Sequence, residues 1–136
     1  MQKVECKVQN SETRIPRTVG NGDLHARTKK FALRIIRLYS AMPKTTEAQV
    51  IGKQLLRSGT SIGAQYCEAE CARSLAEFIS KLGGARQESR ETIYWLELLA
   101  TSGIVPQKRL TDLFDESKQL FAILTASINT AKRRKS

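Results

Sequence analysis

Apolar residues recur every three or four positions along most of the chain, which is the spacing of an amphipathic α-helix. Four such stretches follow one another between residues 24 and 131, and turn-forming residues separate them. Alternation typical of a strand is limited to Val4, Cys6 and Val8, in a polar segment that ends in a glycine-rich turn. The pattern therefore predicts an all-α protein, an antiparallel up-down-up-down four-helix bundle.

The first predicted helix covers residues 24 to 41. Asp23 precedes it as a candidate N-cap, because its carboxylate is able to accept from the free amides of the first turn. Pro43 ends the helix. Its inner face consists of Leu24, Phe31, Ile35, Leu38 and Met42. Leu33 and Ile36 fall outside that face, so we expect them to be exposed in a monomer and to form part of an oligomer interface.

The second predicted helix begins at Thr46, with Gln49 three residues later as the second half of a capping box. Gly52, Gly59 and Gly63 lie on one flank of this helix. Each glycine costs about 1 kcal/mol in a helix interior. This cost indicates either the close approach of another helix or a kink.

The third predicted helix forms a long hairpin with the second, and a short loop at residues 71 to 73 joins them. Ser74 and Glu77 make a second capping box. Arg86 falls in the middle of the inner face, so it needs a partner, and Glu68 is the candidate. Trp95 and Leu98 lie on roughly the opposite side. They predict either a subunit interface or a broader core within one protomer.

Gly103 and Pro106 end the third helix, and a fourth follows with apolar residues at clean helical spacing. We therefore divide the chain into a flexible arm (residues 1–22), the bundle (residues 23–131) and a basic tail (residues 132–136).

Positive charge is concentrated in two segments. The formal net charge is +10, and residues 24 to 44 hold six basic and no acidic side chains. Because the fourth helix runs antiparallel to the first, we expect the tail to approach the first helix and to form one polyanion-binding patch. The alternative is a solvated face with a solubilising tail. The candidate nucleic-acid-binding residues are Arg27, Lys29, Lys30, Arg34, Arg37, Lys132, Arg133, Arg134 and Lys135.

Catalytic and metal-binding patterns are weak. His25 is the single histidine, so neither a Ser-His-Asp set nor the paired Glu-x-x-His motifs of di-iron bundles is indicated. Cys67 and Cys71 are four residues apart, but no histidine is nearby in the sequence to complete a metal site. We expect His25 to be exposed near a helix start. The sequence thus predicts a protein that is not an enzyme, with no metal and no cofactor.

No apolar run approaches the roughly 20 residues of a membrane span, and the first residues lack the apolar centre of a secretory signal. We expect a cytoplasmic protein that does not bind membranes.

The hairpin carries a specific resemblance. The run Leu56-Arg-Ser-Gly-Thr-Ser-Ile-Gly-Ala-Gln-Tyr-Cys-Glu-Ala, and then Glu88-Ser-Arg-Glu-Thr-Ile-Tyr-Trp-Leu-Glu-Leu-Leu, resemble the four-helix-bundle proteins encoded in intervening sequences of bacterial 23S ribosomal RNA genes. The resemblance covers about residues 24 to 131. The family commonly has asparagine where Gln65 stands and a larger apolar residue where Gly84 stands.

The resemblance implies a small bundle that associates into rings, pentamers in particular. A more distant similarity is to the accessory protein of diversity-generating retroelements, which implies a reverse transcriptase and its template RNA as partners. Two functions follow: a basic oligomeric bundle that binds nucleic acid, RNA rather than DNA, or a scaffold subunit of a reverse transcriptase ribonucleoprotein.

Overall fold

The computed structural model describes residues 23–135, so the predicted arm of residues 1–22 lies outside the described range. Four α-helices account for most of it: α1 (Leu24–Ser40), α2 (Thr46–Glu70), α3 (Leu75–Ser102) and α4 (Thr111–Lys135). A short 3-10 helix, η2 (Gln107–Arg109), precedes α4. The predicted all-α four-helix bundle is confirmed.

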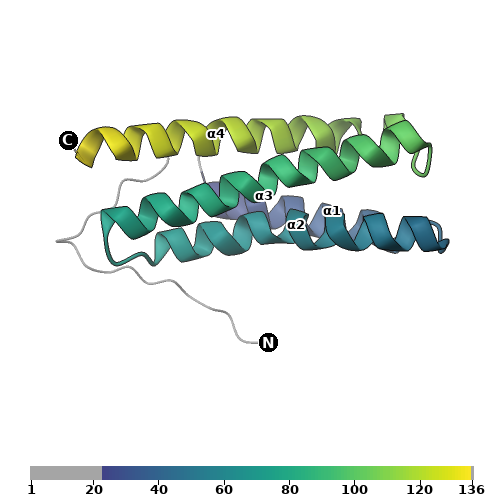
Figure 1. Ribbon diagram of the computed structural model, residues 1–136, viewed down its shortest axis with the longest axis horizontal. Coiled ribbons are helices and arrows are strands. Elements are labelled where there is room, and N and C mark those ends of the chain that lie inside the picture. Colours follow the sequence, from purple (N-terminus) through teal and green to yellow (C-terminus); the bar gives the residue numbers. More distant parts are fainter. Residues whose placement is uncertain (1–22, 136) are drawn as a thin grey trace.

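All four helices lie along one long axis, and consecutive helices run antiparallel (Figure 1). The α1–α2 and α3–α4 connections lie at one end, and the α2–α3 connection lies at the other. Each helix contributes fully buried side chains to a single core, among them Phe31, Leu55, Leu82 and Leu124. Among the described residues, no helix combines the length and the apolarity needed to cross a bilayer.

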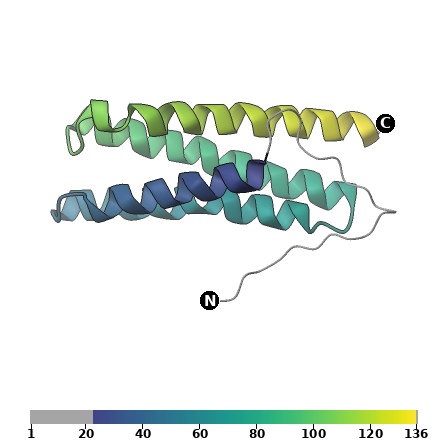
Figure 2. The same cartoon turned by 180° about the vertical axis from the view of Figure 1, so that it is seen from behind.

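The shortest helix is α1, with 17 residues against 25 in α4. At 1.5 Å per residue this is roughly 25 Å against 37 Å. Figure 2 shows α1 beginning part-way along the bundle, with the C-terminal turns of α4 extending beyond it. As a result α1 packs along α2 but has much less contact with α4.

The glycine flank of α2 faces α1. A Cβ added at Gly59 would lie 2.9 Å from Cγ1 of Ile35, and one added at Gly52 would lie 2.8 Å from Cδ1 of Tyr39. Because the added Cβ atoms would meet side chains of α1, the glycines allow the close approach of the two helices. They also set the antiparallel register of the two helices.

The cap of α3 is confirmed. The Ser74 hydroxyl accepts from the amide of Glu77 at 3.0 Å, and the Glu77 carboxylate accepts from the amide of Arg73 at 3.0 Å. At its other end α3 ends at Gly103, whose φ of 80° lies in the left-handed region that favours glycine.

The predicted N-cap position of α1 is confirmed but its side-chain contact is wrong, and the predicted cap of α2 is wrong. Asp23 occupies the N-cap position of α1, but its side chain makes no capping hydrogen bond. On α2 the cap is Thr45, one residue earlier than predicted, and its hydroxyl accepts from a backbone amide of the first turn. Gln49 does not complete a capping box; its side-chain oxygen accepts from the Tyr39 hydroxyl at 2.9 Å, which ties α2 to α1.

The predicted Arg86–Glu68 pair is also wrong. Arg86 is half-buried, with its guanidinium carbon 5.9 Å from the centre of the Phe121 ring on α4. Glu68 instead pairs with Lys81 at 2.6 Å. The long arginine side chain crosses to α4, and the aromatic face stabilises its charge.

Candidate nucleic-acid interface

The outer side of α1 carries a set of unopposed positive charges. Lys29, Lys30 and Arg37 are exposed and Arg34 is half-exposed. None of the four forms a salt bridge with a carboxylate of the described residues. Because α1 contains no acidic residue, its field is not cancelled locally. We call these four residues the α1 basic face.

Arg27 differs from them, although it lies on the same helix. Its guanidinium donates to both carboxylate oxygens of Glu116 on α4, at 2.9 and 2.8 Å, and to the Gln119 side-chain oxygen at 3.0 Å. The hydrogen bond to Glu116 raises the pKa of Arg27 above its usual value, against the effect of burial. Its charge is therefore matched within the protomer, and Arg27 links two helices that otherwise have little contact.

The C-terminal basic residues are not a separate tail, because α4 continues through Lys135. Lys132, Arg133 and Arg134 are exposed on its last turns. Lys132 lies 13 positions beyond Gln119, the residue that meets Arg27, and 13 positions span about 20 Å along a helix. Arg37 lies in the last turn of α1, at the opposite end of the bundle from the C-terminus of α4 (Figure 2). That the two basic segments act as one patch stays a prediction. The α4 basic end (Lys132, Arg133, Arg134) is a second cluster.

The predicted exposure of the α1 apolar pair agrees with the structure: Leu33 is 45% and Ile36 43% exposed. Two other large side chains, not predicted from the sequence to be exposed, are Val50 at 59% and Tyr94 at 53%.

Trp95 has an intramolecular environment. It is partly buried and packs against the core of its own protomer. Its indole nitrogen donates to the Glu91 carboxylate one turn earlier at 2.9 Å, and the Tyr94 ring meets it edge-on with centroids 4.9 Å apart. Trp95 therefore packs on the core within the protomer, and its place in a subunit interface stays a prediction. Leu98 is half-buried.

The structure brings together three residues that sequence reasoning kept apart. His25 Nδ1 lies 2.9 Å from Oε1 of Glu70 and 3.7 Å from Sγ of Cys67. The His25 side chain is 43% exposed at the start of α1, which agrees with the position expected. Burial raises the pKa of the Cys67 thiol, and the carboxylates of Glu70 and Glu68 raise it further.

Two sequence features bear on this cluster. Cys71 is exposed and disulfide-bonded, so the thiol pair that its spacing from Cys67 allowed does not form. The feature of the sequence that could have indicated this cluster is the row of glycines on one flank of α2. A Cβ at Gly63 would lie 3.0 Å from Oγ1 of Thr28, and this register places His25, one turn before Thr28, beside Cys67.

Residues 23–126 match the family described as 23S rRNA-intervening sequence protein. The chain belongs to this family. It is similar to a solved crystal structure from Bacteroides thetaiotaomicron, that of a protein with unknown function from the S23 ribosomal protein family. The two are 39% identical over 78% of this chain and 95% of that chain, with a TM-score of 0.71. No curated protein matches the sequence. The family resemblance of the hairpin is thus confirmed.

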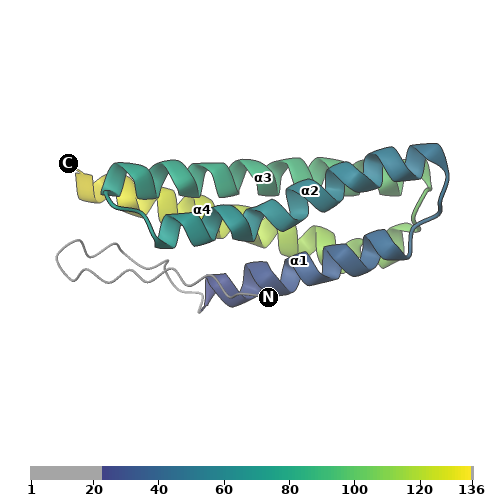
Figure 3. The ribbon, with the colours of Figure 1, turned by 90° about the horizontal axis from the view of Figure 1, so that it is seen from below.

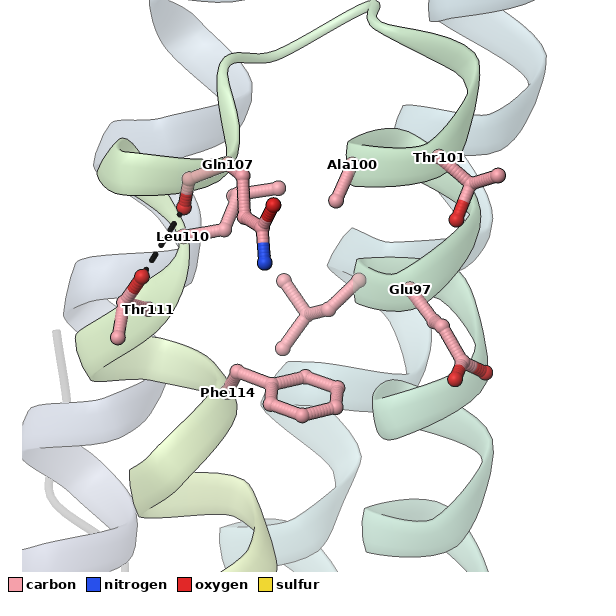
Figure 4. A pocket seen from close by; sticks show the side chains of 8 residues that line it. Glu97, Ala100, Thr101, Gln107, Leu110, Thr111 and Phe114 are labelled. Atoms are coloured by element: carbon pink, nitrogen blue, oxygen red, sulfur yellow. Dashed lines mark hydrogen bonds between the residues drawn. The ribbon is translucent and has the colours of Figure 1, made fainter.

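The protein has a pocket of about 340 Å³ between the C-terminal part of α3 and the start of α4 (Figure 4). Glu97 is its one ionisable lining residue, and Phe114 and Leu110 supply apolar surface. The Thr111 hydroxyl on its rim donates to the backbone oxygen of Gln107 at 3.2 Å. With one carboxylate and no basic lining residue, the pocket does not match the charge that a phosphate ligand requires.

Proposed function

We propose that the protein is a non-catalytic nucleic-acid-binding bundle that contacts the phosphate backbone of structured RNA through the α1 basic face. The observation that carries this proposal is that four cations on one helix lack an acidic partner among the described residues, whereas Arg27 on the same helix is fully engaged. Unopposed cations neutralise phosphates and release counterions, which favours binding.

Recognition follows the backbone and not the bases. Phe31 is 1% exposed and so is unavailable for stacking. Tyr39 packs against the core, and its hydroxyl donates to Gln49. Without an aromatic platform on α1, binding depends on phosphate positions and on the shape of a folded RNA.

A non-catalytic role agrees with the chemistry of the described side chains. A relay of cysteine, histidine and carboxylate uses both ring nitrogens, one for each neighbour. Here Cys67 and Glu70 both approach Nδ1 of His25, so this trio does not form such a relay.

The proposal includes self-association through Leu33 and Ile36. These two residues lie one turn apart on the solvent side of α1, beside the basic face. Joining copies there would repeat the basic face in one particle and increase avidity. A pentamer is the assembly that the family resemblance implies. Sedimentation velocity of the chain carrying Leu33→Ser and Ile36→Ser should show loss of the oligomer. Val50→Ser, a matched change at an exposed apolar residue on α2, should leave it intact.

Filter binding with a base-paired RNA hairpin, at a series of salt concentrations, tests the RNA contact. The test variant carries Lys30→Gln, Arg34→Gln and Arg37→Gln. The matched control carries Lys53→Gln, Arg90→Gln and Lys108→Gln, which removes the same charge from exposed residues of α2, α3 and η2. We expect the test variant to bind RNA more weakly. We also expect the slope of log affinity against log salt concentration to become shallower by about 0.9 for each lost phosphate contact. Equal binding by the two variants would exclude the α1 basic face.

A second candidate function also uses the exposed α1 pair. Leu33 and Ile36 would then dock a partner protein such as a reverse transcriptase, as the similarity to the retroelement accessory protein implies. Purification of the tagged chain from its native cell, with and without nuclease, separates the two functions. A polymerase that survives nuclease and is lost with Leu33→Ser and Ile36→Ser supports the scaffold; loss of all partners after nuclease supports RNA binding.

A further inference from the structure

Figure 3 shows the start of α1 near the end of α2. Three metal-ligating side chains, one from α1 and two from α2, meet in this region. His25 comes from the first turn of α1, and Cys67 and Glu70 come from the last turn of α2. One ligand atom from each, Nδ1, Sγ and a carboxylate oxygen, lies within 4.8 Å of both others. Two helices far apart in sequence thus supply an imidazole, a thiol and a carboxylate to one point.

Two of the ligand atoms approach the third one directly. Sγ of Cys67 and Oε1 of Glu70 both approach the same ring nitrogen of His25, at 3.7 and 2.9 Å. A single nitrogen cannot donate to one neighbour while accepting from the other, since it carries either a proton or a lone pair. With all three ligand atoms within 4.8 Å of one another, a cation between them could take one bond from each.

We propose that His25, Cys67 and Glu70 form a binding site for Zn²⁺. Mixed nitrogen, sulfur and oxygen ligands suit this borderline-soft ion, and three protein ligands with one open position are a common zinc arrangement. Ideal tetrahedral bond lengths would place sulfur about 3.6 Å and oxygen about 3.4 Å from the nitrogen. The observed 3.7 and 2.9 Å require shifts of only a few tenths of an ångström.

Binding has a defined proton balance. Zinc takes the thiolate, neutral imidazole and carboxylate forms, so the Cys67 thiol releases its proton to solvent on binding. The side chains of His25 and Glu70 are 43% and 33% exposed, so water has access to the fourth position and the metal has a route in. The nearest other carboxylate on α2, Glu68, is paired with Lys81 and is not a ligand.

The site would tie the start of α1 to the end of α2. This is the end at which the C-terminal turns of α4 extend beyond α1 (Figure 2). A ligand that binds only the folded chain raises the unfolding temperature as its concentration rises. The proposal concerns α1 anchoring and does not depend on RNA binding.

Cobalt(II) is a spectroscopic probe for the site, since a thiolate ligand gives a charge-transfer band and a tetrahedral site gives strong visible absorption. The experiment uses the full chain with Cys6→Ser and Cys71→Ser, so that Cys67 is the only thiol. We expect one cobalt per chain with a thiolate band, displacement by zinc, and a zinc-dependent rise in Tm.

The ligand variants are Cys67→Ser, His25→Ala and Glu70→Gln, and Glu68→Gln is the matched control on α2. We expect Cys67→Ser to abolish the thiolate band and the other two to weaken zinc at least tenfold, with Glu68→Gln unchanged. Circular dichroism confirms that each variant is folded. A folded parent chain that binds no zinc, a cobalt spectrum unaltered by Cys67→Ser, or zinc affinity unaltered by His25→Ala would overturn the proposal.

Discussion

The side-chain amide of Gln65 on α2 occupies the space that a Cβ would take at Gly84 on α3. A Cβ built there would lie 2.8 Å from Oε1 and 3.0 Å from Cδ of Gln65. At these two positions the resemblance described for the hairpin implies a shorter amide and a larger apolar residue. The structure shows that the two departures are complementary, because the longer side chain fills the space left by the missing one.

This complementarity predicts coupling between the two positions. Gly84→Ala gains helix propensity but displaces the Gln65 amide, and Gln65→Asn makes room by shortening that side chain. We therefore expect Gly84→Ala to be more favourable, by roughly 0.5–1 kcal/mol, when Gln65→Asn is also present. Urea unfolding of both single variants and the double variant measures this coupling. Strictly additive effects would show that the contact carries no energy.

Gly59 and Gly83 should respond in opposite ways to the same substitution. Both lie inside long helices, so alanine gains up to about 1 kcal/mol of propensity at each. At Gly83 the new Cβ meets nothing within 4 Å, so Gly83→Ala should stabilise the fold. At Gly59 it would lie 2.9 and 3.0 Å from the two γ-carbons of Ile35, which is fully buried and β-branched.

Because Ile35 is buried and its β-branched side chain is restricted at χ1, Gly59→Ala should push α1 away from α2. The resulting loss of stability should exceed the gain in helix propensity, by on the order of 1–3 kcal/mol net. The urea midpoints of the two alanine variants give this comparison directly. Equal stabilisation by both would mean that α1 is not held against α2 at this register.

Arg27 and Glu116 should contribute to stability, not to RNA affinity. Their side chains are 29% and 19% exposed and pair in the bidentate geometry that makes an ion pair effective. We expect Arg27→Ala to lower the free energy of unfolding by about 1 kcal/mol. Arg34→Ala, on the same flank of α1 but without an ion pair among the described residues, should change stability little and weaken RNA binding. The reverse ranking in paired unfolding and filter-binding measurements would contradict both assignments.

The sequence predicted the helices well because burial enforces the spacing. Leu24, Phe31 and Ile35 are buried as their spacing requires. The spacing gives the angle of a residue around its helix but not the axial offset between helices. For this reason it did not show that Arg27 meets Glu116, about 24 Å along α4 from Lys132.

The reach of long side chains is a second reason why the sequence pattern did not predict some of the contacts. Trp95 lies opposite the inner face by angle, yet its large ring still packs against the core, and Arg86 crosses to Phe121 instead of pairing on α2. The cluster at His25 was not predicted from the sequence, for a different reason. It depends on the α1–α2 register, which Gly63 encodes but which becomes readable only once its partner Thr28 is known.

Glu91 should make stability depend on acidic pH. Its carboxylate accepts from the Trp95 indole at 2.9 Å and also from Arg57 on α2. The Trp95 hydrogen bond lowers the pKa of Glu91 below its usual 4.5, and Arg57 lowers it further, while burial opposes both. A lowered folded-state pKa means that the unfolded chain binds the proton more readily. The stabilisation is therefore fully present above the unfolded value and is lost as pH falls through the folded one.

Glu91→Gln removes this titration. The stability difference between the native chain and Glu91→Gln should be largest at neutral pH and should shrink as pH falls below about 4.5. Because Trp95 is the single tryptophan of the chain, its fluorescence follows urea unfolding at each pH and reports the same contact. Glu97→Gln, on the same helix but with no ion pair in the described part of the chain, is the control and should not reproduce this pH dependence. A Glu91→Gln difference that stays constant from neutral to acidic pH would show that the indole and guanidinium contacts do not favour the ionised carboxylate.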